Sequence, residues 1–207
     1  EKDSFNEEDW TDTEAEGCSA YNKSKTYAEK AAWDFINSDE CNMELSVINP
    51  SLVLGPVLES DFGTSVEVVK RFLNGGFPLA PNISFGIVDV RDVAQLHMLA
   101  LESPQASGNR FIASSETMAI PLISEVLREK IPEFQKKLPK GTAPDFLIKL
   151  LGLFSPLMRT VADQLGKTKK LDNSKAKNLL GWQPRSGEEA VVASAKSLIE
   201  FNIVKSP

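Results

Sequence analysis

Cysteine and histidine are scarce in this chain. Its 207 residues include two cysteines, Cys18 and Cys41, and one histidine, His97. So few thiols exclude a disulfide-rich scaffold and favour a reduced, cytoplasmic protein. Because no second histidine or cysteine stands at metal-ligand spacing from His97, we expect no metal site and interpret His97 as an ordinary helix residue.

Long apolar runs and a surplus of positive charge are also missing. No hydrophobic segment reaches the ~18 residues that a membrane-spanning helix needs. Residues 1–16 are acidic, unlike the basic and then apolar start of a signal peptide. The net charge of −6 disfavours sequence-independent binding to nucleic acid. We therefore expect neither a membrane nor a nucleic acid as partner.

Charge is unevenly distributed along the chain. Residues 1–16 hold eight acids and one lysine, whereas residues 130–177 hold eleven Lys or Arg and four acids. We favour the interpretation that both are solvated surfaces. The alternative is that the basic stretch, with Lys136, Lys137 and Lys140, attracts an anionic ligand such as a phosphorylated or CoA-like substrate.

The hydrophobic pattern predicts an α/β fold. Before residue 118 it predicts strands over residues 44–49, 83–88 and 109–113, separated by helices over 19–36, 65–73 and 93–102. Asp89 or Asp92 offers an N-cap for the last of these helices. Such alternation indicates parallel βα units. We interpret residues 1–118 as the later part of a partial Rossmann-like parallel sheet.

The two ends of the chain follow other patterns. Residues 1–16 have little periodicity and are predicted to be an acidic loop anchored by Phe5 and Trp10. After residue 118 the pattern predicts helices over 121–130, 144–153, 156–165, 173–180 and 187–201, with a short extended piece at 168–171. We interpret residues 119–207 as a helix-rich substrate lobe, interleaved with the first region. Whether Met158, Val161 and Leu165 line a pocket or form core is left open.

Tyr21 and Lys25 are the side chains best suited to chemistry. They form Y-x-x-x-K in a predicted helix, and the i, i+4 spacing places both on one face. A lysine ammonium about 4 Å from a phenol favours the phenolate by roughly 4 kcal/mol at an effective dielectric of about 20. Such a tyrosine can exchange a proton with a carbonyl or an alcohol. The alternative is an ordinary exposed pair on a helix.

Five segments occur in an informative order: YNKSKTYAEKAAWDF, NPSLVLGP, VDVRDVAQLHMLALE, GNRFIASSE and LGWQPR. In that order they resemble the extended short-chain dehydrogenase/reductase superfamily, also called the NAD-dependent epimerase/dehydratase superfamily. Within it they look most like the dihydroflavonol-4-reductase/cinnamoyl-CoA-reductase-like branch. The resemblance runs from about residue 5 to about residue 200. It implies an NAD(P)-dependent oxidoreductase that reduces a ketone or aldehyde or oxidises the alcohol, with NADP slightly favoured.

The resemblance also implies roles for five residues. Tyr21 corresponds to the catalytic acid that protonates the developing alkoxide. Lys25 corresponds to the residue that activates the tyrosine and holds the nicotinamide ribose. Pro50, Ser51 and Leu52 correspond to the loop after a strand that lies against the nicotinamide. Tyr21, Lys25 and these three loop residues are therefore the implied cofactor-binding set.

The sequence departs from the family in its phosphate-binding and serine elements. It has no glycine-rich βα turn to seat a pyrophosphate and no identifiable residue that selects NAD or NADP. The family's catalytic serine is not identified, since Ser4 lies in the acidic loop and Ser19 is only two residues from Tyr21. We therefore expect the C-terminal part of a longer enzyme, with the 207-residue chain alone inactive.

Partners and rival functions follow from the same features. We expect a homo-oligomer or association with the missing N-terminal portion. The small and apolar residues of the first helix suit such an interface: Ala28, Ala31, Ala32 and Phe35. The alternatives to a reductase are a sugar-nucleotide epimerase or dehydratase of the same superfamily, and a non-catalytic half-fold binding protein.

Overall fold

The computed structural model describes residues 4–38 and 41–205. Its strands are β1 (Ser4–Phe5), β2 (Ser46–Pro50), β3 (Leu52–Leu54), β4 (Ser84–Asp89), β5 (Asn109–Ala113), β6 (Glu116–Ala119) and β7 (Lys170–Leu171). Its α-helices are α1 (Ala20–Ile36), α2 (Glu67–Leu73), α3 (Val90–Glu102), α4 (Ile120–Lys130), α5 (Asp145–Gly152), α6 (Pro156–Ala162), α7 (Ser174–Leu180) and α8 (Gly187–Glu200). The predicted α/β class is confirmed.

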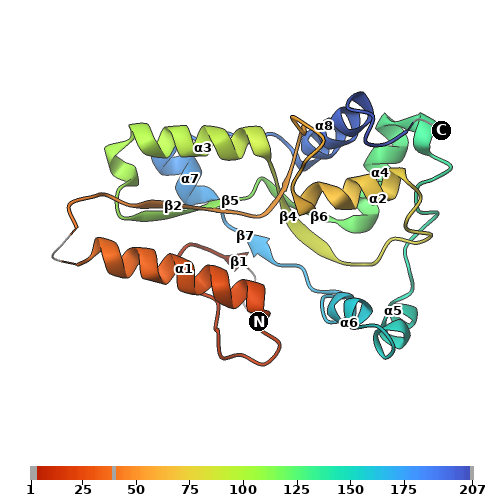
Figure 1. The fold of residues 1–207 in the computed structure, drawn as a ribbon, viewed down its shortest axis with the longest axis horizontal. Coiled ribbons are helices and arrows are strands. Elements are labelled where there is room, and N and C mark those ends of the chain that lie inside the picture. Colours follow the sequence, from red (N-terminus) through yellow and green to blue (C-terminus); the bar gives the residue numbers. More distant parts are fainter. Residues whose placement is uncertain (1–3, 39–40, 206–207) are drawn as a thin grey trace.

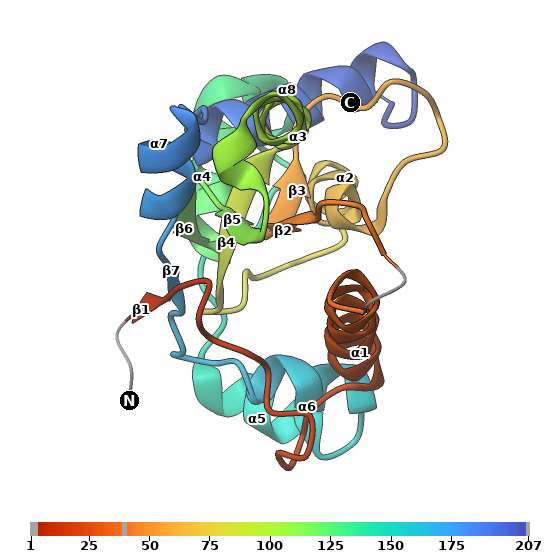
Figure 2. The same cartoon turned by 90° about the vertical axis from the view of Figure 1, so that its left-hand side faces the viewer.

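The strands of the described residues form three small sheets, ordered β1-β7, β2-β5 and β3-β4-β6. β2 pairs in parallel with β5, and β3 pairs in parallel with β4, whereas β6 runs antiparallel to β4. Only Ser51 separates β2 from β3, so the chain passes directly from one sheet into the next (Figure 2). Gly86 in β4 leaves room for Ser51 at this crossing. A Cβ on residue 86 would lie only 3.0 Å from the Cβ of Ser51, which is closer than ordinary van der Waals contact.

The sequence pattern predicts the longer elements well and the short strands poorly. Ser4–Phe5 was expected in a loop but forms β1, parallel to β7. Leu52, also expected in a loop, begins β3, and β6 lies where the pattern indicates no strand. These strands have two to four residues. So few residues show no clear period of two, and pairing with segments distant in the sequence determines their conformation.

Helices cover the sheets unequally. In both views α3 and α7 lie on one side of β2 and β5, while α1 lies on the other (Figures 1 and 2). α8 contacts β3, β4 and β6 and packs on α2 and α4. α5 and α6 pack on each other as a hairpin that lies apart from the α8 layer (Figure 2).

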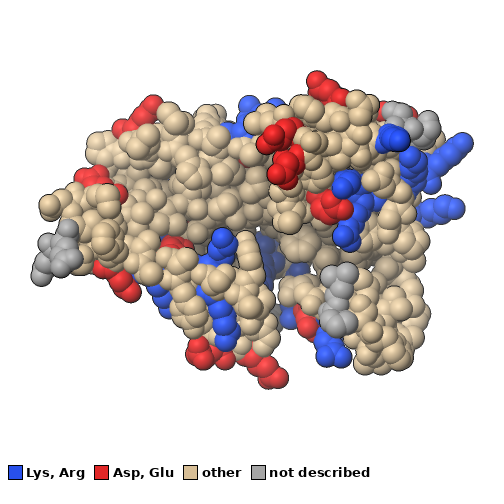
Figure 3. Space-filling model, viewed as in Figure 1, with Lys and Arg blue, Asp and Glu red and all other residues tan. Residues whose placement is uncertain are grey.

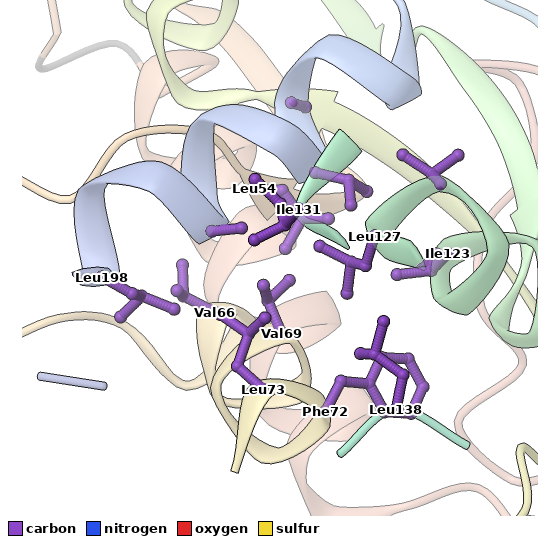
Figure 4. Close-up of a cluster of buried hydrophobic side chains, with 14 of the residues drawn as sticks. Leu54, Val66, Val69, Phe72, Leu73, Ile123, Leu127, Ile131, Leu138 and Leu198 are labelled. Atoms are coloured by element: carbon purple, nitrogen blue, oxygen red, sulfur yellow. The ribbon is translucent and has the colours of Figure 1, made fainter. Parts of the chain in front are cut away.

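The main hydrophobic core lies between α2, α4, α8 and the β3-β4-β6 sheet (Figure 4). Phe72, Leu127 and Leu198 are fully buried in it. Val161 and Leu165 pack against this core from the C-terminal region, which answers the question that the sequence left open for them. The core draws on residues from both sides of position 118, where we predict the boundary between the two regions.

Candidate functional site

Tyr21 and Lys25 lie in the first two turns of α1. Ser19 caps this helix, since its Oγ accepts a hydrogen bond from the Asn22 N–H at 3.1 Å. The Lys25 ammonium nitrogen lies 5.6 Å from the centroid of the Tyr21 ring. Tyr21 is 68% exposed and Lys25 is also exposed. The two side chains are therefore neighbours, as their spacing predicts, and both are open to solvent.

A cavity of about 1050 Å³ opens beside the N-terminus of α1. Pro50 and Ser51, at the C-terminal end of β2, form part of its wall together with Ser19 and Asn22. The acidic segment, from residue 5 to residue 16, lines another side of the cavity. Further lining residues are Arg110 and Ile112 of β5, Thr160 of α6, and Lys167 and Lys169 before β7. In open α/β sheets, ligands bind outside the C-terminal ends of parallel strands. The cavity therefore occupies the part of the fold where a substrate or cofactor is expected.

The structure brings only some of the predicted site residues into this cavity. Pro50 and Ser51 are in its wall, whereas Tyr21, Lys25 and Leu52 are not. Leu52 packs against the main hydrophobic core. Tyr21 and Lys25 are exposed on the helix whose first turn contributes to the wall.

The Pro50–Ser51 wall is fixed by β5. Pro50 pairs with Ala113 at the end of the parallel register. The backbone N–H of Ser51 donates to the Ala113 carbonyl at 3.0 Å, and its hydroxyl donates to the same oxygen at 3.3 Å. The proline ring restricts φ at this position. This part of the cavity is consequently a rigid surface.

An arginine that the sequence pattern does not single out joins α1 to the rest of the molecule. Arg110 of β5 donates from Nε to one Glu29 carboxylate oxygen at 2.6 Å and from Nη2 to the other at 3.2 Å. Its Nη1 donates to the Glu7 carbonyl at 2.5 Å. The guanidinium carbon lies 3.8 Å from the centroid of the Trp10 ring. We call these four residues, Arg110, Glu29, Glu7 and Trp10, the Arg110 clamp.

The Arg110 clamp connects three segments that are far apart in sequence: the acidic segment, α1 and β5. The side chains of Arg110 and Glu29 are only 16% and 13% exposed, so solvent screens their ion pair weakly. The contact confirms that Trp10 anchors the acidic segment. An arginine next to the apolar residues Phe111, Ile112 and Ala113 of a predicted strand is the one sequence signal for the clamp, because charged residues are rarely buried unless paired.

A second charged pair lies where β4 meets α3. Asp89 is fully buried, and its carboxylate accepts hydrogen bonds from the side chain of Arg91 at 2.9 and 2.7 Å. Burial raises the pKa of Asp89, but the hydrogen bonds and positive charge of Arg91 outweigh it, so the pKa lies below its ordinary value. Asp89, rather than Asp92, is the N-cap of α3.

Asp89 also positions the chain after β3. Gly55 has a φ of +112°, and a Cβ there would lie 2.8 Å from an Asp89 carboxylate oxygen. Only glycine suits this position, because it tolerates the positive φ and has no Cβ to collide with the Asp89 carboxylate. The N–H of Gly55 donates to the Ser194 hydroxyl of α8 at 2.8 Å. The LVLGP segment is therefore held between β4 and α8.

Residues 4–38 and 41–205 contain neither a metal-binding cluster nor a membrane-spanning helix. Nowhere in these ranges do three His, Cys, Asp or Glu side chains gather in a way that could hold a metal ion. His97 is exposed on α3, with Nδ1 2.8 Å from the Val93 carbonyl oxygen. Within the same ranges, every helix is too short or too polar to cross a membrane.

Comparison with known proteins identifies relatives of this chain, although no protein-family model matches it. It is 31% identical over 210 residues to the NADPH-dependent methylglyoxal reductase GRE2 of Saccharomyces cerevisiae, covering 95% of this chain and 57% of that protein. It is 38% identical over 137 residues to cinnamoyl-CoA reductase CAD2 of Medicago truncatula, covering 64% of this chain and 40% of that protein.

A solved structure agrees with these relatives. The yeast methylglyoxal/isovaleraldehyde reductase Gre2, complexed with NADPH, matches with a TM-score of 0.75 and 28% identity over 98% of this chain and 58% of that one. The chain thus spans about half the length of the relatives it matches. As its motifs predict, this chain is a homologue of reductases in the dihydroflavonol-4-reductase/cinnamoyl-CoA-reductase-like branch of the extended short-chain dehydrogenase/reductase superfamily.

Proposed function

We propose that the protein containing this chain is an NADPH-dependent reductase of a ketone or aldehyde, with Tyr21 as proton donor. The observation that carries the proposal is the Tyr21–Lys25 pair, exposed on a helix whose first turn shares a cavity wall with Pro50 and Ser51. The similarity to an NADPH-dependent reductase supports the same chemistry. The two free thiols support a reducing compartment, and we propose the cytoplasm.

The residues present fit the nicotinamide end of such a cofactor. Lys25 and Tyr21 offer exposed hydrogen-bond donors of the kind that ribose hydroxyls accept from. Pro50 and Ser51 offer a fixed wall at a strand end. When bound, NADPH supplies the hydride that reduces the carbonyl carbon. The sequence holds no glycine-rich turn for the pyrophosphate, so the fit concerns the nicotinamide end alone.

Tyr21 and Lys25 divide the proton chemistry between them. The Tyr21 hydroxyl donates its proton to the carbonyl oxygen as negative charge develops there, which leaves a phenolate. The Lys25 ammonium stabilises this phenolate by its charge. Because Tyr21 is 68% exposed, water can return the proton. In the oxidative direction the phenolate accepts the proton of the alcohol.

Association through α1 belongs to the same proposal. Tyr27, Ala28, Ala31 and Phe35 are exposed on this helix, two of them large and apolar. Exposed apolar residues of this kind commonly meet a partner surface. We propose that a second copy of the chain or an N-terminal portion of the protein covers them. Light scattering on the wild-type 207-residue chain and on Phe35→Ser tests the second-copy form of this proposal, and a monomeric wild-type chain would contradict that form.

Substitution of Tyr21 in the whole protein tests the reductase proposal. Tyr21→Phe should lower turnover of the best carbonyl substrate by ~10²-fold or more and leave NADPH affinity nearly unchanged, because general acid catalysis contributes about 10² to 10⁴. Lys25→Met should harm both turnover and affinity. Tyr27→Phe is the matched control, since it removes the hydroxyl of the other tyrosine on α1.

Two outcomes distinguish the proposal from its rivals. Near-normal turnover of Tyr21→Phe would refute the catalytic role. NADPH binding without turnover of any carbonyl compound, by wild type and variants alike, would favour a non-catalytic binding protein. For the 207-residue chain alone, calorimetric titration with NADPH should show no micromolar binding, since its sequence supplies no pyrophosphate cradle.

A further inference from the structure

The α5–α6 hairpin exposes an unusual concentration of large apolar side chains. Phe154 is 81% exposed and Phe146 is 72% exposed. The two phenylalanines alone expose on the order of 300 Å². The set is completed by three leucines, and we call it the α5–α6 patch: Phe146, Leu150, Leu151, Leu153 and Phe154. A patch of this size on a protein surface usually marks a contact with another molecule.

The α5–α6 patch is presented by a well-packed element. Ile148 and Gly152 are the buried residues of α5. A Cβ at Gly152 would lie 3.2 Å from the Cα of Arg159, so glycine lets the two helices approach closely. The segment before α5 is hydrogen-bonded to the body of the molecule, since the Ala143 N–H donates to the Ala80 carbonyl at 2.7 Å. The apolar side chains thus point outward from a folded hairpin.

The patch is separate from the candidate active site. The cavity beside α1 takes Thr160 from α6, and Asp163 and Gln164 from the residues that follow it. No residue of the α5–α6 patch lines that cavity. The proposed reductase chemistry therefore leaves this surface unexplained.

Basic charge accompanies the apolar surface. The α5–α6 hairpin carries two basic side chains, Lys149 and Arg159, and a single carboxylate, Asp145, in a chain whose net charge is −6. Lys149 and Arg159 are exposed, and so is Lys140 in the segment before α5. Figure 3 shows the area over α5 almost free of charged side chains, with blue side chains at its margin. An apolar surface bordered by Lys and Arg is the pattern of proteins that lie on a membrane surface.

We propose that the α5–α6 patch docks on the surface of an anionic lipid bilayer. Phe146 and Phe154 would enter the headgroup region, while the basic side chains meet anionic headgroups. A symmetric contact between two copies fits less well, because it would bring two basic surfaces together. The expectation of no membrane partner rested on the absence of a spanning segment, and surface docking requires none.

Vesicle flotation of the whole protein that contains this chain tests this proposal. It should float with phosphatidylcholine vesicles that contain phosphatidylserine, and much less with phosphatidylcholine alone or at high salt. The double variant Phe146→Ser/Phe154→Ser should lower partitioning at least about tenfold. Lys149→Gln should lower it about fivefold, the effect expected for one basic residue near such a surface. Leu58→Ser and Leu101→Ser are matched controls, being 87% and 81% exposed outside the patch.

The outcomes separate lipid docking from other uses of the surface. Retained partitioning in both controls, with loss in the double variant and an unchanged circular dichroism melting curve, would support the proposal. Equal partitioning of all variants, or no flotation of the wild type, would overturn it. A wild-type dimer that the double variant converts to a monomer would assign the patch to a second copy instead. None of these readouts depends on reductase activity.

Discussion

Helices α1 and α8 are of similar length but differ in how much of their surface is buried. All residues of both helices are described. α1 has 17 residues, of which only Thr26 is buried. α8 has 14 residues, of which seven are buried. One helix carries the candidate catalytic pair and the other carries much of the core.

Different interactions hold the two helices in place. α8 contributes Leu198 to the main core, and its Ser194 and Ser197 hydroxyls accept hydrogen bonds from the Gly55 and Val57 N–H groups. α1 is joined to β5 through the Arg110–Glu29 ion pair. Apolar burial is non-directional and grows with the area removed from water, whereas an ion pair depends on the placement of a few polar atoms. The candidate chemistry therefore lies on a helix that contributes no residue to the main core.

The largest expected effect comes from truncating one apolar side chain on each helix. Leu198→Ala should lower the free energy of unfolding by about 2 to 5 kcal/mol, because it leaves a cavity in the core. Phe35→Ala on α1 should change it by less than about 0.5 kcal/mol in the monomeric chain, because the ring is 55% exposed there. Urea unfolding followed by circular dichroism measures both. Similar losses of unfolding free energy in the two variants would show that α1 contributes to global stability as much as α8 does.

The buried carboxylate at the start of α3 should make stability depend on pH. The pKa of Asp89 is lower in the folded than in the unfolded state, so its contribution is present above the unfolded value of about 3.9. It is lost as the pH falls through the folded value. Asp89→Asn should therefore cost about 2 kcal/mol at neutral pH and progressively less in acid.

Urea unfolding of wild type and Asp89→Asn at neutral and acidic pH measures that difference. Asp172→Asn is a useful control, because its pKa is also lowered, by the Ser174 hydroxyl and N–H, while the residue itself is exposed. A constant difference between wild type and Asp89→Asn across the pH range would mean that Asp89 acts through shape rather than charge.

Weakening the Arg110 clamp should affect α1 and leave the core nearly intact. Arg110→Lys keeps the charge but loses the bidentate contact and the stacking on Trp10, at a cost of about 1 to 2 kcal/mol. We expect a change in Trp10 fluorescence well before the main unfolding transition. Arg71→Lys is the matched control, since its ion pair with Glu67 is exposed. An unchanged Trp10 signal in Arg110→Lys would contradict the assigned role.

The smallest expected effects concern the helix caps. Ser186 forms a capping box with Glu189 at the start of α8, and Ser19 caps α1. Ser186→Ala should cost about 1 kcal/mol of global stability. Ser19→Ala should cost less than about 0.5 kcal/mol in the same measurement, because the start of α1 can fray without exposing the core. Equal global losses would show that α1 unfolds together with the core.

Long periodic helices and contacts between neighbours in the sequence can be predicted from the sequence, whereas contacts between distant segments cannot. The periodicity of residues 19–36 predicts α1, and the Y-x-x-x-K spacing predicts the proximity of Tyr21 and Lys25. No local pattern predicts that Arg110 contacts Glu29, 81 residues away, or that Ser4 pairs with Lys170. The same holds for Leu52. The sequence pattern predicts a loop there, but the residue pairs with Ile87 where β3 lies beside β4.

Native-state hydrogen exchange of the backbone amides measures how firmly α1 and α8 are each held in the fold. If α1 is held mainly by the Arg110 clamp, amides in its middle turns should exchange at least ~10²-fold faster than those of α8, through local opening that leaves the core folded. Arg110→Lys should widen the gap by weakening the contact with Glu29. Equal protection of both helices, unchanged in Arg110→Lys, would show that the core stabilises α1 as well.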